Sequence, residues 1–347
     1  MRFLTIMLCA LGLAAFDDNT NTANAATQNE QVVNLYSSQQ EHLIRPVLVN
    51  FTKKTGITVN LTTGGNAELV TRLEYEGENT PADMLLTVDI GNVYQAKDKG
   101  LLQVVESEIL SGNILAYLRD PEGYWFGITS RARLIFYHKD RVEAHAVQNY
   151  ADLADDRWKG RVLIRSSNNV YNQSLVASRV AHDGREAALK WAKGLVANMA
   201  RSPQGGDTDQ IKALLAGEGD LAVANSYYYG RLIAGDESVR DPKVAEKIGV
   251  IFPDQEGHGT HVNIRGGGVT KYAKNRANAV KLLEYLVQEP AQRFFADANL
   301  EYPANLAVKA NSAVEAWGEF NRDQLNLEEV GKHQRTAIEV MDEAGWR

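Results

Sequence analysis

The sequence predicts an α/β protein with two lobes, and three observations lead to this prediction. Short apolar segments alternate with longer amphipathic ones along most of the chain, and no internal repeat or low-complexity linker interrupts them. In the first part their order is strand–helix–strand–helix–strand, which is typical of a parallel sheet covered by helices. A length of 347 residues is enough for about two domains. Because no linker separates the lobes, we expect the chain to cross between them more than once.

The first 26 residues have the features of a cleavable secretory signal. Arg2 supplies a positive charge, residues 4–16 are mostly apolar, and residues 23–26 (ANAA) match a small-residue cleavage site. The apolar run is shorter than the ~20 residues that a spanning helix needs. An N-terminal membrane anchor is the alternative. Cys9 is the only cysteine, so we expect the exported chain to use no cysteine as a metal ligand or nucleophile.

The apolar periodicity then predicts the elements in order. The first strands are expected at residues 32–36, 57–61 and 82–87, with helices at 41–55 and 68–76; Gly56 ends the first helix. A strand-like run covers residues 129–136. Strands at 162–165 and 220–224 each lead into a helix, the first beginning at residue 170 and the second covering 227–234. A strand at 247–252 is followed by Gly266–Gly268, interpreted as a turn because the Lys-Ser/Thr of a phosphate-binding loop is missing. Helices are expected at 277–288, 291–298, 313–320 and 327–343.

The composition limits the class of partner. Charged residues make up 23% of the chain and the formal net charge is −7, which argues against nucleic-acid binding. After the signal, no apolar run approaches spanning length, so we expect a protein that is not embedded in a membrane. Tyrosine is unusually frequent, with 14 residues against 9 phenylalanines. This directs attention to where the tyrosines gather.

Three consecutive tyrosines, Tyr227 to Tyr229, follow an apolar strand and open a helix for which Asn225 and Ser226 are suitable caps. At such a corner the backbone turns, so neighbouring side chains can converge on one point. The partial positive charge of a helix N-terminus also favours phenolate over phenol. Tyr171 occupies the same setting after the strand at 162–165. We therefore expect tyrosines from two helix starts to meet at the carboxyl ends of strands, where such folds bind ligands.

Three phenolate ligands favour a highly charged, hard cation. A tyrosine has a pKa of about 10, so ionising three near neutral pH requires a highly charged cation. Oxygen ligands select hard ions, which separates Fe³⁺ from the metals that cysteine or histidine prefer. However, tyrosines also line ordinary helix–sheet boundaries, and a cleft for a sugar or an aromatic ligand would use them too. The residues alone leave these alternatives open.

Two segments around these tyrosines resemble the iron-binding segments of the bacterial ferric-ion-binding proteins. They are residues 225–232 (NSYYYGRL) and 165–175 (RSSNNVYNQSL); residues 34–38, 127–133 and 261–264 are similar too. The resemblance covers essentially the whole exported chain. It implies a type II periplasmic binding protein fold with a hinge and an interlobe cleft. Its lobes would be residues 27–131 plus 258–308 and residues 132–257 plus 309–347.

The same resemblance implies a function. The protein would be a monomeric periplasmic receptor that captures Fe³⁺ and delivers it to an inner-membrane ABC permease. Carried over by motif, the metal ligands are Tyr171, Tyr227 and Tyr228, whereas Tyr229 has a structural role. Many relatives place His or Tyr in the loop after the first strand, where this chain has Gln39-Gln40-Glu41. Carbonate, another anion or water would complete the coordination, as in relatives that use only tyrosine ligands.

The anion would need a partner. Arg131 and Arg133 share one face of the run at 129–136, and Arg131 could hold carbonate by charge-assisted hydrogen bonds, supported by Thr129 or Ser130. A solvent-facing pair is the alternative. Glu41 is the competing ligand, because its carboxylate could bind iron directly.

Other readings of the chain are less favoured. His258 and His261 are three residues apart, but they lie at a lobe crossover and not on a helix, so we do not expect them to bind zinc. His42, just beyond Gln39–Glu41, is expected on a helix surface, and the alternative is that it reaches the cleft. A secreted hydrolase would need a nucleophile elbow or an H-E-x-x-H motif, and neither is present; we expect no enzyme. A small-anion receptor of the same fold is the remaining alternative.

Overall fold

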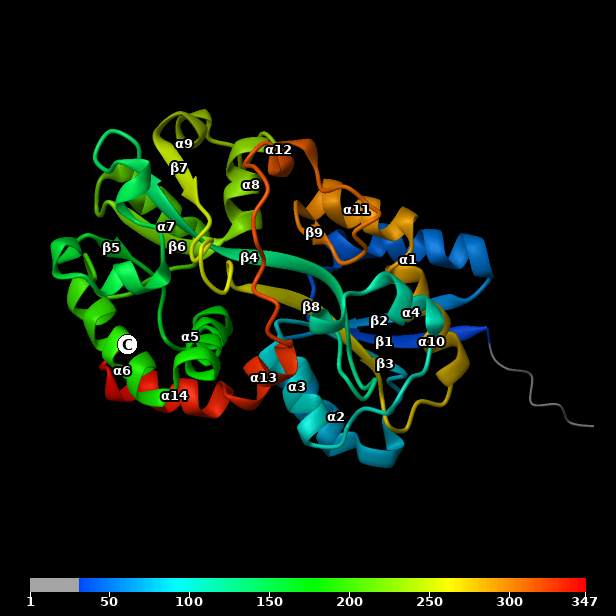
Figure 1. Ribbon diagram of the computed structural model, residues 1–347. Helices are drawn as coiled ribbons and strands as arrows, with labels where there is room; N and C mark the ends of the chain where they lie inside the picture. Colours follow the sequence, from blue (N-terminus) through cyan, green and yellow to red (C-terminus); the bar gives the residue numbers. More distant parts are fainter. Residues whose placement is uncertain (1–30) are drawn as a thin grey trace, which may run out of the picture. The chain divides into compact units, whose positions relative to one another are not determined.

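The computed structural model describes residues 31–347 (Figure 1), so the predicted signal sequence and Cys9 lie outside the described part. Strands and helices alternate through most of these residues, which confirms the predicted α/β class. Within the same range, no helix is both long enough and apolar enough to cross a membrane.

The first three strands and the helices between them form close to their predicted positions. The strands are β1 (Val32–Ser37), β2 (Thr58–Thr63) and β3 (Met84–Val88), and β1 pairs in parallel with both of the others. The helices are α1 (Glu41–Thr55) and α2 (Asn66–Glu76). Gly56 ends α1 with a φ of 75°, a left-handed conformation that glycine adopts without steric cost.

A long central strand, β4 (Phe126–His138), joins two groups of strands (Figure 1). Its residues 126–132 pair with β8 (Val262–Val269), and this part also pairs with β9 (Tyr302–Pro303). Its residues 133–138 pair with β6 (Leu221–Asn225) and β7 (Ile248–Ile251). The short strand β5 (Val162–Leu163) pairs with β6. The resulting order is β2-β1-β3-β8-β4-β6-β5.

The sheet is mixed, whereas the sequence predicted a parallel one. Strand β8 runs antiparallel to both β3 and β4, and β6 and β7 run antiparallel to β4. The parallel prediction holds for β1 with β2 and β3 and for β5 with β6. The difference arises because the chain returns late in the sequence to insert β8 between β3 and β4, a long-range pairing that local periodicity does not reveal.

The helices that follow the later strands also begin near their predicted positions. They are α5 (Val170–Asp183), α8 (Ser226–Ala234), α10 (Arg276–Leu286) and α11 (Glu289–Asn299). Further helices are α3 (Ile90–Asp98), α6 (Arg185–Asn198) and α7 (Asp207–Ala216). Shorter helices are α4 (Glu108–Asn113) and α9 (Pro242–Lys247).

Two predicted helices near the C-terminus differ from the structure. The helix expected at 313–320 is only the single turn α12 (Ser312–Glu315). The helix expected at 327–343 is divided at His333 into α13 (Leu327–Lys332) and α14 (Gln334–Glu343). The apolar spacing therefore predicts helices in these two regions correctly, but it does not predict where each helix ends.

The interpretation of Gly266–Gly268 as a turn is wrong, because these glycines lie inside β8. A Cβ built on Gly268 would be 2.5 Å from the carbonyl oxygen of Tyr124, and one on Gly267 would be 3.1 Å from Cε of Met84. Glycine is needed here so that neighbouring chain segments can approach β8 closely.

Strands β3 and β6 are buried along nearly their whole length, as expected for apolar strands covered by helices. Their polar neighbours come directly after the strands end, at Asp89 beyond β3 and at Ser226 beyond β6. The candidate site forms around these strand ends.

Candidate metal centre

The predicted tyrosines lie together. Tyr171 is in the first turn of α5 and Tyr227 in the first turn of α8, and their hydroxyl oxygens are 3.3 Å apart. The rings of Tyr227 and Tyr228 are neighbours, with centroids 4.2 Å apart. Three phenols from two helix starts therefore gather within a few ångströms of one another.

Local structure explains how these tyrosines are presented. Asn169 is the N-cap of α5, and its side chain accepts a hydrogen bond from the backbone N–H of Tyr171 at 3.1 Å. The hydroxyl of Ser226, the first residue of α8, accepts from the backbone N–H of Ala132 on β4 at 3.3 Å. The start of α5 is thus capped by an asparagine two residues before Tyr171. The start of α8 has no side-chain cap, in contrast to the expectation for Asn225 and Ser226, and is instead anchored to the central strand by Ser226.

The third tyrosine of the triplet is placed differently. Tyr229 is buried, its hydroxyl donates to the carbonyl of Ile248 at 3.1 Å, and its ring packs against Phe136 and Trp317. These contacts agree with the structural role expected for Tyr229.

Burial strongly opposes ionisation of the clustered phenols. It raises the pKa of Tyr227 well above the usual value, and the neighbouring Tyr171 and Tyr228 add to this, whereas Arg131 opposes it. Burial also raises the pKa of Tyr228, again helped by Tyr171 and by the carboxylate of Asp207. Without a cation, the hydroxyls of Tyr227 and Tyr228 therefore carry protons at neutral pH.

Three arginines lie over the phenol rings, and one of them is Arg165, whose guanidinium carbon is 5.7 Å from the ring centroid of Tyr171. The guanidinium carbon of Arg131 is 5.3 Å from the ring centroid of Tyr171, and that of Arg231 is 5.0 Å from the ring centroid of Tyr227. Their positive charge favours anionic groups at this place. Sequence reasoning considered Arg131 and missed Arg231, which stands one helical turn after Tyr227 and so shares its face of α8.

Arg131 is buried, with 2% of its surface exposed, so the alternative of a solvent-facing arginine pair is wrong. Its Nη2 is 3.2 Å from Oδ2 of Asp89, and its Nε has no hydrogen-bond partner within residues 31–347. Asp89 is fully buried and also accepts from the hydroxyl of Ser174 on α5. Desolvation raises the pKa of Asp89, and Arg131 opposes that rise.

Asp89 was not singled out as a site residue, although its backbone is unusual. Its φ is 97°, which costs strain for a residue other than glycine. This conformation lets the carboxylate cap α3, accepting from the backbone N–H of Gly91, while also facing Arg131. The sequence offered no signal for such a backbone.

The two hydroxyls expected beside Arg131 face different surroundings. Thr129 donates to Oε2 of Glu301 at 2.8 Å, and Glu301 is also bound by Arg265. Ser130 is buried, and its hydroxyl finds no partner in the part of the chain that the structure describes. Thr129 thus hydrogen-bonds to a buried ion pair, whereas Ser130, one residue before Arg131 on β4, lies on the opposite face of the strand.

Glu41 lies at the start of α1 and pairs with Arg45 one turn further along, at 2.5 Å. Both side chains are about half exposed, since 54% and 48% of their surfaces are accessible. In this conformation, Glu41 is engaged on the helix surface.

The start of α1 nevertheless lies near one of the tyrosines. A cavity of about 570 Å³ is lined on one side by Gln40 and His42 and on the other by Tyr228 and Arg231 of α8. His42 is exposed, as expected, and it also faces the cavity that contains a predicted ligand. The position of His42 thus agrees with both alternatives left open by the sequence, the helix surface and the cleft.

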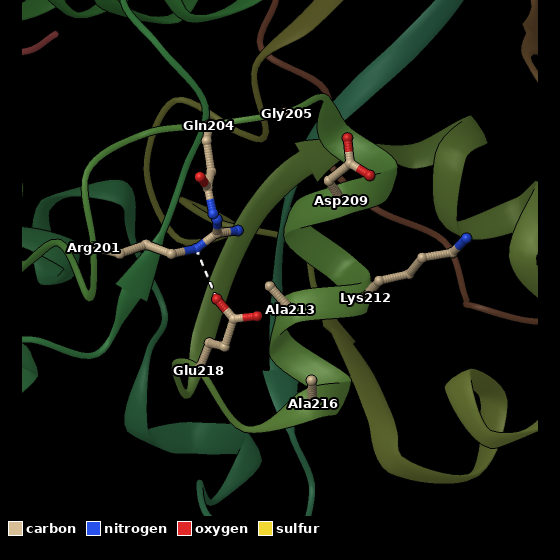
Figure 2. Close-up of a pocket in the computed structure, with 8 residues that line it drawn as sticks. All are labelled: Arg201, Gln204, Gly205, Asp209, Lys212, Ala213, Ala216 and Glu218. Carbon is tan, nitrogen blue, oxygen red and sulfur yellow. Dashed lines mark ion pairs between the residues drawn. The ribbon is translucent and has the colours of Figure 1, made fainter.

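A second hollow of about 460 Å³, shown in Figure 2, runs along α7 and lacks tyrosine in its lining. Figure 2 shows Arg201 pointing toward Glu218, with which it forms a 3.1 Å ion pair, and Lys212 pointing away from this pair. One cation is thus neutralised and the other is turned outward, so this hollow does not resemble a ligand site.

The histidines of the crossover face other groups. His258 stacks on His182, with ring centroids 3.8 Å apart, and His182 is 2.9 Å from Asp323. Burial lowers the pKa of His261 to about 4. Across residues 31–347, no group of three or more His, Cys, Asp or Glu side chains is arranged to hold a metal ion. Among the described residues, the tyrosines are therefore the better candidate ligands.

Comparisons with known proteins identify the class. Residues 47–322 match a family model described as bacterial extracellular solute-binding protein, and the chain belongs to this family. It is 50% identical over 318 residues to iron uptake protein A1 of Synechocystis, covering 92% of this chain and 88% of that protein.

Solved structures give the same result. A Trichodesmium protein (IdiA, FutA) in complex with iron and citrate is 46% identical, has a TM-score of 0.87, and matches over 91% of this chain and 100% of its own. A ferric binding protein from Campylobacter jejuni is 39% identical with a TM-score of 0.86, again over 91% of this chain and 100% of its own. These comparisons confirm the predicted two-lobed fold class and the resemblance to bacterial ferric-ion-binding proteins.

Proposed function

We propose that this chain is a periplasmic receptor that binds Fe³⁺ through the phenolates of Tyr171, Tyr227 and Tyr228 and delivers it to an inner-membrane ABC importer. The observation that carries the proposal is the convergence of these phenols, with the hydroxyl oxygens of Tyr171 and Tyr227 3.3 Å apart. Relatives named for iron uptake and for ferric binding support the same cargo.

The surroundings suit a trivalent ion. Two partly or fully buried phenols with raised pKa values lose their protons only if a strong positive charge replaces them. Oxygen ligands of this kind select a hard cation. Bound Fe³⁺ would also relieve the repulsion among the phenolates, which the positive charges of Arg131 and Arg231 already reduce.

Three phenolates leave coordination positions open, and we propose that a carbonate or another anion fills them. Arg131 is the anchor, because its Nε is unpartnered among the described residues while its Nη2 holds Asp89. Of the two hydroxyls expected to support the anion, that of Thr129 shares the face of Arg131 on β4 but is occupied by Glu301, and Ser130 lies on the opposite face of the strand. Glu41 remains the competing ligand, although it would first have to leave Arg45.

The lobe boundaries drawn from the resemblance belong to the proposal as well. The change of pairing partners along β4, from β8 to β6, falls between Ala132 and Arg133 and supports a boundary at this place. The three proposed ligands would then all belong to the second lobe. Gln40 and His42, at the start of α1 in the first lobe, line a cavity together with Tyr228.

The test is a visible spectrum of the purified protein loaded with Fe³⁺, together with metal analysis. The wild type should be coloured, because ferric phenolate absorbs visible light. Tyr227→Phe and Tyr228→Phe keep the aromatic ring and remove one ligand, so both should lower ferric affinity and change the band. Tyr229→Phe is the matched control within the same triplet, and it should leave the band unchanged.

A colourless wild type, or a band and a ferric affinity that are the same in Tyr227→Phe and Tyr228→Phe as in the wild type, would refute tyrosine ligation. A colourless protein that binds phosphate or another small anion would point to the anion receptor considered from the sequence. Binding to the importer is tested separately, by stimulation of the permease ATPase in membrane vesicles with iron-loaded protein.

A further inference from the structure

The side chain of Arg133 lies at the centre of the tyrosine-bearing half of the sheet. It is 2% exposed, and it faces three polar side chains from three different elements. Its Nη1 donates to Oδ2 of Asp207 at 2.7 Å and to Oδ1 of Asn225 at 3.2 Å. Its Nη2 donates to Oδ1 of Asn172 at 2.6 Å. One guanidinium thus connects the starts of α5 and α7 with the end of β6.

Two of these partners stand beside the proposed ligands in the sequence. Asn172 directly follows Tyr171, and Asn225 is the N-cap residue of α8, two positions before Tyr227. The backbone N–H of Asn225 also donates to Asp207 at 3.0 Å. The two helix starts that present tyrosines are therefore held by the same charged group.

Asn172 extends this connection into the loop that leads to Tyr171. Its side chain is fully buried, and its Nδ2 donates to the carbonyl of Arg165 at 2.7 Å and to that of Ser166 at 3.1 Å. The amide thus closes the turn between β5 and α5 on one side and binds Arg133 on the other. A shift of the guanidinium would be transmitted to the backbone that carries Tyr171.

The energetics favour a fixed geometry. Removing a charged guanidinium from water costs several kcal/mol and is compensated only when its donors find well-placed acceptors. Although its Nε lacks a partner within residues 31–347, both terminal nitrogens of Arg133 are bound, to a carboxylate and two amide oxygens at 2.6 to 3.2 Å. Displacing any of these oxygens would leave a further buried donor unpaired. The arrangement therefore resists changes in the spacing between the elements.

We infer that Arg133 is a positioning residue of the proposed iron site: it sets the spacing between Tyr171 and the Tyr227–Tyr228 pair without touching the metal. The inference rests on the proposed ligation by tyrosine. It gives Arg133 a role distinct from that of Arg131, two residues earlier on β4, whose partner is Asp89.

The experiment compares substitutions in this connection with a matched control. Arg133→Met removes the donors and keeps an extended side chain, and Asn172→Ala removes the link to Tyr171. The control is Asn198→Ala, because Asn198 is also a buried amide that bridges two loop carbonyls, those of Leu153 at 2.9 Å and Asp155 at 2.7 Å. For each protein we would measure the free energy of unfolding without metal, the ferric affinity and the wavelength of the visible band.

Arg133→Met and Asn172→Ala should weaken ferric binding by about 10- to 100-fold, the usual effect of removing a group that orients metal ligands. Both should also shift the visible band, because the phenolates meet iron in altered geometry. Arg133→Lys should recover part of the affinity, since one ammonium can still bind Asp207. Asn198→Ala should destabilise the fold while keeping the wild-type band and affinity.

A different outcome would contradict the positioning role of Arg133. If Arg133→Met and Asn172→Ala lose stability but keep the wild-type band and affinity, as Asn198→Ala should, then Arg133 has only a structural role. Should Arg133→Met fail to fold because Asp207 is left unpaired, the double variant Arg133→Met/Asp207→Asn removes both charges, and Asn172→Ala decides in any case. A wild type without the ferric–phenolate band would refute the proposed function instead, so the two failures are distinguishable.

Discussion

His261 should make the protein sensitive to acid by a route that does not involve iron. This histidine is 3% exposed and directly precedes β8, and no partner for its Nε2 lies within residues 31–347. Burial lowers its pKa from 6.5 to about 4; Arg133, Arg131 and His182 also lower it, and Asp323 opposes them. Between these two pH values, the unfolded chain binds a proton at this position and the folded chain does not.

The free energy of unfolding must therefore fall as pH falls through this window. One pKa unit corresponds to about 1.4 kcal/mol, so the depressed pKa of His261 accounts for about 3 kcal/mol between pH 6.5 and 4. This is a large share of the 5–15 kcal/mol that stabilises a typical domain. Above pH 6.5, His261 is neutral in both the folded and the unfolded chain, so none of this stability is lost.

Denaturant titrations of the metal-free protein at several pH values, followed by tryptophan fluorescence, would measure this effect. His261→Leu removes the titrating group, so its stability should depend less on pH by about 3 kcal/mol over the window, whatever its stability at neutral pH. His145→Leu, at an exposed histidine, is the control and should keep the wild-type slope. Equal slopes in the wild type and His261→Leu would refute the reasoning.

The remaining predictions concern the proposed site. Because burial raises the pKa of both Tyr227 and Tyr228, iron binding near neutral pH should release about two protons or more and weaken as pH falls; proton release below one per iron in an unbuffered titration would contradict this. Reduction to Fe²⁺ should weaken binding, so that ascorbate together with a ferrous chelator removes the iron and the visible band. A band that persists under these conditions would contradict this prediction. Arg131→Ala should weaken iron binding and shift the band, bicarbonate-free buffer should mimic it, and Glu41→Ala should have little effect; the reverse pattern would make Glu41 the ligand. Since Gln39, Gln40 and Glu41 stand where many relatives have His or Tyr, iron alone should cause little compaction in solution scattering. A large decrease in the radius of gyration would oppose this.

Local sequence was sufficient for much of the fold. The helix at 41–55 begins and ends as predicted, because its apolar spacing is regular and Gly56 stops it. By contrast, Gly266–Gly268 looked like a turn but is a strand, since only the packing of Met84 and Tyr124 against it explains the glycines. Helix ends near the C-terminus were also missed, because they are set by contacts between distant segments.

The candidate site shows the same division. Tyr171, Tyr227 and Tyr228 could be found because strand–helix corners place them at sheet ends. The sequence also placed Arg131 and Arg133 on one face of a strand, but it could not distinguish burial from exposure or assign their separate partners. Those partners, Asp89 among them, come from segments far away in the chain. Backbone strain at Asp89 has no local signature at all.

Because β4 is continuous, this protein cannot be divided into independent fragments at a single point in the sequence. Residues 126–132 complete the sheet that contains β8, and residues 133–138 complete the sheet that contains β6. A gene fragment that ended within β4 would leave each piece with part of a strand and with unpaired edges, which favour aggregation. Because β8 returns to β4 from the late part of the sequence, no single protease cut would release either sheet intact. Domain-swap chimeras with a relative would accordingly have to exchange several separated segments at once, with β4 retained from one parent.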